Sequence, residues 1–170
     1  MSEIFILNAS PIIFLGKAQL LRTISPLGDT WIIPQGVAQE VAAKRPMSFY
    51  IPDLSTHAHV REKHITTIHP SITAWDLGQG ESEVLTLALQ MPGTTAVLDD
   101  LQARKCAKLF NIPLIGSLGL ILSAKRKGLI PLAKPHLDQL IGAGLYVDPA
   151  LLNKLLAAVD ECHSPEDACE

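Results

Sequence analysis

Residues Ile4 to Leu15 read IFILNASPIIFL, and this stretch decides the fold class. The continuous apolar run Ile4–Leu7, which ends at Asn8, is typical of a strand that is buried on both faces. Ser10 and Pro11 then indicate the start of a helix, because Pro suits the first helical position and a serine side chain can cap the free amides there. The stretch therefore predicts a strand followed directly by a helix.

The same alternation continues along the chain. We expect further strands at Trp31–Ile33, Ile65–Ile68, Ala96–Leu98 and Pro113–Ile115. Apolar residues at helical spacing follow most of these strands, and two more helices are predicted at Pro131–Ile141 and Ala150–Val159. Short apolar strands that alternate with helices predict an α/β fold with a central parallel sheet covered on both faces.

Length and composition indicate a single globular unit. The chain has 170 residues, of which 48% are hydrophobic and 18% charged, a balance that forms one core and argues against disorder. We expect one domain over residues 1–160 and a polar tail over residues 161–170. There is no signal peptide pattern, no window apolar enough to span a membrane and no paired cysteine motif, so we expect a soluble, cytoplasmic protein.

Charges of opposite sign are separated along the sequence. The net charge is −3, yet residues 101–135 contain no Asp or Glu and seven bases, which are Arg104, Lys105, Lys108, Lys125, Arg126, Lys127 and Lys134. Such a segment fits an anionic partner such as nucleic acid, and it fits equally well two ordinary solvated helix faces. The turn Gly116–Gly119 is similarly open to two interpretations, a phosphate cradle at a helix start or a tight connection.

Polar side chains cluster where the predicted strands end and the predicted helices begin. Asn8 and Asp99 end strands, and Glu40 and Glu81 lie in the first turns of helices. In a parallel α/β sheet these positions meet at the carboxyl edge, where ligands bind. Glu81 and Asp100 also have ordinary roles open to them, because acids near a helix start favour the dipole and cap free amides.

Glu40 has no such simple explanation. We place it on one helix face with Val37 and Val41, where a lone carboxylate is costly unless it is paired or bound to metal. Carboxylates are ligands for Mg²⁺ or Mn²⁺, and such a cation can activate water for phosphodiester hydrolysis. The chain has no G-x-S-x-G or Walker A pattern that would indicate another chemistry.

Six sequence pieces, in this order and spacing, resemble the short prokaryotic PIN-domain proteins, which are predicted nucleic-acid-binding proteins related to the VapC-like toxin ribonucleases. The pieces are LNASPIIFL (7–15), IPQGVAQEV (33–41), LGQGESEVL (77–85), LDDLQAR (98–104), IGSLG (115–119) and AKRKGLIP (124–131). The resemblance covers nearly the whole chain to about Asp160 and implies a three-layer α/β/α sandwich with a Mg²⁺ or Mn²⁺ site.

The resemblance also implies roles for single residues. Glu40, Glu81 and Asp99 look like three acidic ligands, with Asp100 as an alternative to Asp99 and Glu83 as a weaker alternative to Glu81. Ser10 looks like the hydroxyl beside the first acid. That first acid is usually aspartate, and this chain has Asn8 there, which can coordinate metal through its amide oxygen but brings no charge.

The function that the resemblance implies is a metal-dependent endoribonuclease, the toxin of a toxin–antitoxin pair. Its expected partners are RNA, an antitoxin protein and a second copy of the chain in a homodimer, with no membrane. The nucleic-acid-binding residues would be Arg104, Lys105, Lys108, Lys125, Arg126 and Lys127. Asn8 favours an alternative, a PIN-fold module that binds RNA or protein without cutting. A phosphatase or nucleotidase that uses the same acids is a third reading.

Overall fold

Five parallel strands form one sheet in the order β3-β2-β1-β4-β5. The computed structural model describes residues 2–161 of the chain. The strands are β1 (Ile4–Leu7), β2 (Thr30–Pro34), β3 (His59–Lys63), β4 (Thr94–Val97) and β5 (Leu114–Ile115). Each connection crosses over through helices, as parallel pairing requires, and the chain switches direction between β3 and β4. The expected parallel α/β sheet is confirmed.

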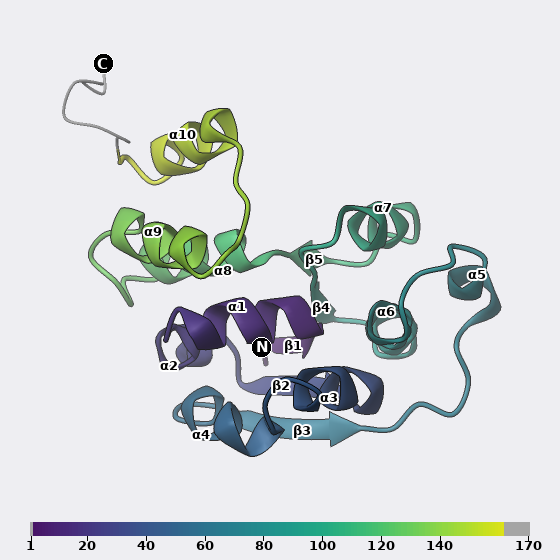
Figure 1. Cartoon of the computed structure of the whole chain (residues 1–170). Helices are drawn as coiled ribbons and strands as arrows, with labels where there is room; N and C mark the ends of the chain where they lie inside the picture. The colour runs from purple at the N-terminus through teal and green to yellow at the C-terminus, as the bar shows by residue number, and fades with distance from the viewer. Residues whose placement is uncertain (1, 162–170) are drawn as a thin grey trace.

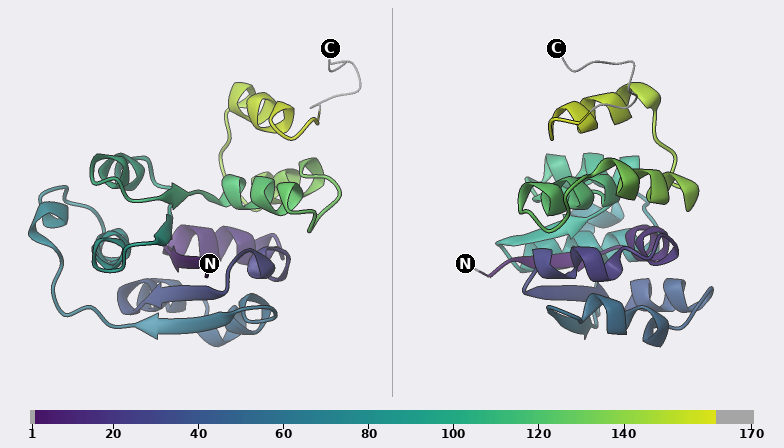
Figure 2. Two further views of the ribbon diagram at one scale, coloured as in Figure 1. Left: turned by 180° about the vertical axis from the view of Figure 1, so that it is seen from behind. Right: turned by 90° about the vertical axis from the view of Figure 1, so that its left-hand side faces the viewer.

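Helices cover both faces of this sheet. They are α1 (Ala9–Lys17), α2 (Leu21–Ile24), α3 (Gln35–Ala42), α4 (Ile51–Leu54), α5 (Pro70–Thr73), α6 (Gln79–Gln90), α7 (Leu101–Leu109), α8 (Ser117–Arg126), α9 (Lys134–Gly142) and α10 (Pro149–Ala157). Two short 3-10 turns, η1 (Ser25–Leu27) and η2 (Met47–Phe49), join them. Around β4 and β5, α6 and α7 lie on one side and α1 with α8 on the other (Figures 1 and 2).

The core lies on both faces of the central strands. Ile6 and Leu7 in β1 are fully buried, as is Trp31 in β2. The Trp31 ring stacks on Phe5 with centroids 4.6 Å apart, and its indole Nε1 donates to the Ser25 carbonyl over 3.2 Å. The stacked rings and the hydrogen-bonded indole stabilise this register of β1 and β2, in addition to the stabilisation that comes from burying apolar area. In the described part of the chain, no helix is long and apolar enough to cross a membrane.

Two local predictions are wrong. Residues 65–68 form no strand; the strand at this edge of the sheet is β3, with the polar sequence HVREK, most of it exposed. An edge strand borders a neighbour on one side only and needs no apolar alternation, so the composition signal was misleading. Helix α1 begins at Ala9, with Asn8 at the N-cap position and no side-chain cap bond, so Ser10 lies inside the first turn and does not cap it.

The end of the described chain is tied to α9. Glu161 accepts hydrogen bonds from the backbone N–H groups of Ala133 at 2.6 Å and Lys134 at 2.8 Å, which satisfies two free amides at the α9 N-terminus. Glu161 is the first residue of the predicted polar tail, and residues 162–170 of that tail lie outside the described residues.

Candidate metal centre

Asn8 and Asp99 leave the sheet side by side at its carboxyl edge. Leu7 of β1 pairs with Val97 of β4 in parallel register, and the Asn8 N–H donates to the Val97 carbonyl at 3.1 Å. Asp99 follows β4 by two residues, so both side chains emerge beyond the last pair of the ladder. This is the position where open parallel sheets place their ligands.

The Asn8 amide is buried and only half satisfied. Asn8 as a whole is only 1% exposed. The Nδ2 group donates to Glu81 Oε1 over 3.0 Å, whereas Oδ1 has no hydrogen-bond partner among the described residues. A buried acceptor without a partner costs about 1–3 kcal/mol, so a donor or cation bound at this oxygen would relieve that cost.

Glu40 faces the same space as this unpartnered oxygen. A Cβ atom on Gly80 would lie 3.0 Å from Glu40 Oε2 and 3.1 Å from Asn8 Oδ1. The absence of a side chain at Gly80 therefore keeps open the small volume into which both oxygens point. Glycine is the residue type that allows such a close approach of a helix to a polar pocket.

Electrostatics supports the proximity of the two glutamates. Burial raises the pKa of the Glu40 carboxyl, the negative charge of Glu81 raises it further, and Lys44 acts in the opposite direction. Two carboxylates that repel each other beside an unpartnered amide oxygen form a donor set that fits a hard divalent cation.

The position of Glu40 corrects the sequence prediction. Val37 and Val41 are buried, but Glu40 is exposed. At 3.6 residues per turn Glu40 lies about 60° from Val37 and about 100° from Val41, on the flank of α3. The residue reaches the site from the side of the helix, where partial burial still raises its pKa, so the cost expected for an acid on an apolar face is reduced rather than absent.

Asp99 is bonded to the start of α8. Its Oδ1 accepts from the Ser117 N–H at 2.8 Å and its Oδ2 from the Ser117 hydroxyl at 2.6 Å. Arg104 lies beside it, since Asp99 Oδ1 and Arg104 Nη1 would each be 3.0 Å from a Cβ on Gly116. The Ser117 amide is thus engaged by Asp99, which favours the tight-connection reading of the turn Gly116–Gly119 over a phosphate cradle.

Asp100 and Glu83 have structural contacts. Asp100 caps α7 by accepting from the Ala103 N–H at 2.8 Å, the ordinary role that its position allowed. Glu83 is buried and accepts from the Gly36 N–H at 2.7 Å and from Gln79 Nε2 at 3.1 Å, so it satisfies the N-terminus of α3. Neither side chain is directed to the space between Asn8 and Glu40 by these bonds.

The acids do not gather into a complete cluster. Within residues 2–161 no group of three or more His, Cys, Asp or Glu side chains lies close enough together to hold a metal ion. Two glutamates and the Asn8 amide form the closest grouping that the contacts describe, with Asp99 held at the neighbouring strand end by Ser117. Asn8 contributes an amide oxygen and no carboxylate to this set.

Only some of the bases that were predicted to bind nucleic acid lie near the candidate centre. Arg104 lies at the carboxyl edge beside Asp99 and donates to the Leu98 carbonyl at 2.9 Å. Lys105 and Lys108 are exposed on α7. Lys127, in contrast, pairs at 3.6 Å with Glu3, which precedes β1 at the opposite edge of the sheet.

The direction of α8 explains this error. Its ten residues run for about 15 Å from Ser117 at the carboxyl edge to Arg126. Lys125 pairs with Glu161 at 3.6 Å near that far end. The expectation that Lys125, Arg126 and Lys127 border the acidic site is therefore wrong, because bases that are close in sequence are separated by the length of a helix.

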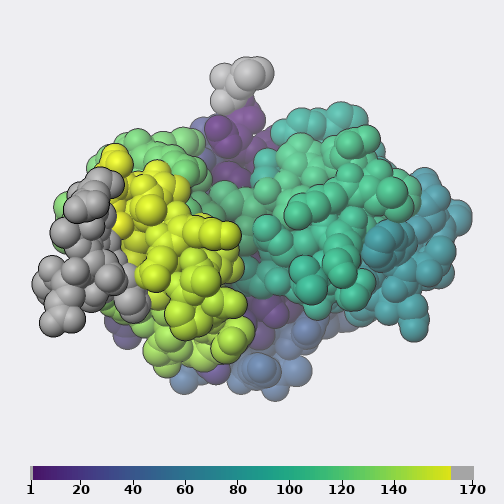
Figure 3. Space-filling model, turned by 90° about the horizontal axis from the view of Figure 1, so that it is seen from above, coloured from purple at the N-terminus to yellow at the C-terminus, as the bar shows by residue number. Residues whose placement is uncertain are grey.

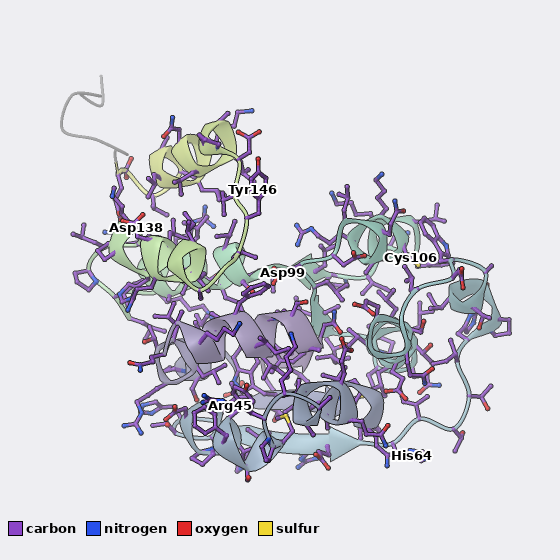
Figure 4. All side chains as sticks on the ribbon, viewed as in Figure 1. Arg45, His64, Asp99, Cys106, Asp138 and Tyr146 are labelled. Atoms are coloured by element: carbon purple, nitrogen blue, oxygen red, sulfur yellow. The ribbon has the colours of Figure 1, made fainter. Side chains whose placement is uncertain are left out.

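An apolar pocket of about 400 Å³ opens next to Asp99 and Arg104. Its other walls come from β5, the first turn of α8, and α10 with the loop before it, which contributes Tyr146. Figure 3 shows the hollow between α10 and α7, and Figure 4 shows Tyr146 above Asp99. Sequence reasoning gave no sign of this pocket, because its lining comes from segments far apart in the chain.

The arrangement of strands and helices agrees with a comparison to known families. A family model described as a PIN domain matches residues 4–161. The chain belongs to the PIN-domain family. A search of curated proteins finds none that matches it. The PIN domain is a nuclease-type fold, and PIN nucleases generally use divalent metals. Membership in this family is therefore consistent with a divalent metal at the candidate centre, and it assigns no role to any single residue.

Proposed function

We propose that this PIN-domain protein is a metal-dependent endoribonuclease that hydrolyses phosphodiester bonds at the carboxyl edge of its sheet. The observation that carries the proposal is the buried, unpartnered Asn8 Oδ1, which faces one space with Glu40 Oε2 while its amide nitrogen holds Glu81. Polar atoms are rarely buried without partners unless a ligand or solvent completes them.

Asn8, Glu40 and Glu81 would hold Mg²⁺ or Mn²⁺, with Asp99 next to them. Such a cation, when bound, activates a water molecule and neutralises charge that builds on the phosphoryl oxygens. The Asn8 amide orients Glu81 through its Nδ2 bond, and Ser117 fixes the Asp99 carboxylate. Arg104 brings a positive charge to the same edge, where a phosphate would meet it.

A second candidate function is a module that binds RNA or protein without cutting. Asn8 favours it, because two acids and a neutral amide hold a divalent cation less strongly than three acids. The toxin role, the antitoxin partner and the homodimer stay predictions from the family resemblance.

The experiment that separates these functions uses purified protein, mixed RNA and Mn²⁺. We expect cleavage by the wild type, loss of cleavage with EDTA, and a loss of at least 100-fold in the nearly isosteric Glu40→Gln variant. Glu3→Gln is the matched control, because Glu3 makes only a surface ion pair at the opposite edge. Intact RNA with the wild type, or equal cleavage by the Glu40→Gln variant, contradicts the nuclease proposal.

A further inference from the structure

A second pocket, of about 590 Å³, lies on the side of the domain formed by α1, α2 and the segment that follows α3. Figure 4 labels Arg45 in this region, below α1. We call it the α1–α3 pocket. Its charged lining residues are four bases and one acid: Lys17, Arg22, Lys44, Arg45 and Asp53. The pocket is therefore strongly positive although the chain as a whole has a net charge of −3.

Most of this positive charge is free to act on a ligand. Arg22 pairs with Asp53 at 3.3 Å. Lys17, Lys44 and Arg45 form no ion pair with any residue in the part of the chain that the structure describes, and all three are exposed. Three unneutralised cations around one concave surface attract an anionic ligand with several charges.

The pocket also offers an aromatic face. Phe49 is 55% exposed, unusually so for a large apolar side chain, and lines the pocket. It packs edge-on against Tyr50, and the Arg45 guanidinium lies 4.6 Å from its ring centroid. An exposed ring beside cations is the arrangement with which proteins stack bases and hold the backbone of single-stranded nucleic acid.

Helix α3 connects this pocket to the candidate metal centre. Glu40 belongs to that centre, and Lys44 follows it by four residues, about one helical turn. The Lys44 N–H bonds to the Val41 carbonyl, so the turn continues past the end of α3. Lys44 is therefore the lining residue of the pocket nearest to Glu40 along the chain, whereas Lys17 and Arg22 lie at or beyond the C-terminal end of α1.

We propose that the α1–α3 pocket binds the phosphate backbone of single-stranded RNA beside the metal centre, with Phe49 stacked on a base. The choice of RNA rests on the proposed function. An acidic peptide would pair with the cations but would not stack on the exposed ring. Because Lys44 follows Glu40 by one turn, RNA bound at that end of the pocket would lie near the proposed cleavage site.

The test measures binding of a fluorescently labelled single-stranded oligouridylate by anisotropy, in EDTA so that no cleavage intervenes. Changing Lys17, Lys44 and Arg45 to Gln together should weaken binding at least tenfold and lower the slope of log affinity against log salt by about two. Phe49→Ala should weaken binding about tenfold, and Phe49→Trp should restore it.

The matched control changes Arg126, Lys127 and Lys134 to Gln, which removes the same charge near the far end of α8 and should leave the affinity within twofold. Thermal melts establish that each variant is folded. If the pocket triple variant is not folded, Lys44→Gln alone replaces it, with Lys127→Gln alone as its control.

Equal losses in the two triple variants, no RNA binding by the wild type, or tighter binding of polyglutamate than of RNA would overturn the proposal. RNA binding that depends on the pocket without any cleavage in Mn²⁺ would leave it standing and remove the nuclease function instead.

Discussion

At the scale of single residues, the amide at Asn8 determines how the site behaves without metal. Its Nδ2 group gives Glu81 a hydrogen bond that an aspartate could not donate, so it reduces the repulsion between acids in the free protein. Its Oδ1 atom remains unpartnered. We therefore expect Asn8 to lower the affinity of the proposed site for a cation and to make the metal-free protein more stable than an aspartate would.

Asn8→Asp tests this balance. The new carboxylate would face Glu81 and Glu40, so we expect the metal-free protein to lose about 1–3 kcal/mol of unfolding free energy. Mn²⁺ should bind more tightly and raise the melting temperature more than it does in the wild type. Calorimetry of Mn²⁺ binding with melts in EDTA and in Mn²⁺ measures both effects. Unchanged metal affinity would show that position 8 does not contact the cation.

The raised pKa of Glu40 predicts how metal binding depends on pH. Because the folded state retains the Glu40 proton more strongly than the unfolded chain, this residue's contribution to stability falls as pH rises from the ordinary carboxyl value through the raised one. Metal needs the ionised form, so Mn²⁺ affinity should fall on acidification at a less acidic pH than for an ordinary carboxylate.

Lys44 provides the matched variant for this pH dependence. Lys44 lowers the pKa of Glu40, so Lys44→Gln should shift the loss of Mn²⁺ binding to still higher pH, whereas Glu40→Gln should remove that step. Titrations of Mn²⁺ affinity between about pH 4 and pH 8, the range in which carboxylates and histidines ordinarily ionise, would be the measurement. Superimposable curves for the wild type and Lys44→Gln would contradict the assignment of the step to Glu40.

At the scale of elements, the sequence predicted what is buried and missed what lies at the edge. β1, β2 and β4 were located from short apolar runs, because central strands must be apolar on both faces, and β5 was located in the same way although it is an edge strand. β3 and the one-turn helices α2, α4 and α5 were not, since few buried residues define them. For the candidate site, the positions of strand and helix ends pointed to Asn8 and Glu81. Glu83 lies two residues further along the same helix, and only the hydrogen-bond partners in the structure distinguish it from Glu81.

Glu83 joins α6 to α3, and this contact predicts a purely structural effect. Glu83→Ala would leave the Gly36 N–H without its acceptor at the start of α3 and should cost about 2–3 kcal/mol of unfolding free energy. Urea denaturation measures the loss. Mn²⁺ affinity should change less than threefold, in contrast to Glu81→Ala, which removes a proposed ligand. Loss of metal binding without loss of stability in Glu83→Ala would reverse the two roles.

At the scale of the whole molecule, folding rearranges the charges that the sequence presents in order. The bases of residues 101–135 divide between the carboxyl edge, near Arg104, and the far end of α8, near Lys127. Bases from three other segments, with Lys17, Arg22 and Lys44 among them, meet in the α1–α3 pocket. Charge patterning along a sequence therefore indicated an anionic partner but not the surface that would bind it, because helix direction and crossover connections set the final positions.

The proposed binding of RNA in the α1–α3 pocket predicts that cleavage depends on substrate length. A substrate that reaches both the centre and the α1–α3 pocket should gain from the contacts at Lys44 and Phe49, so kcat/KM should rise steeply until the RNA is about four nucleotides long or more. Kinetics with oligouridylates of two to twelve nucleotides would measure this. In Phe49→Ala the gain with length should shrink, while activity on dinucleotides stays close to that of the wild type, because those substrates do not extend into the pocket. A nucleotidase, the third reading of the acids, would instead act best on mononucleotides, and a flat dependence on length would separate the metal centre from the basic pocket.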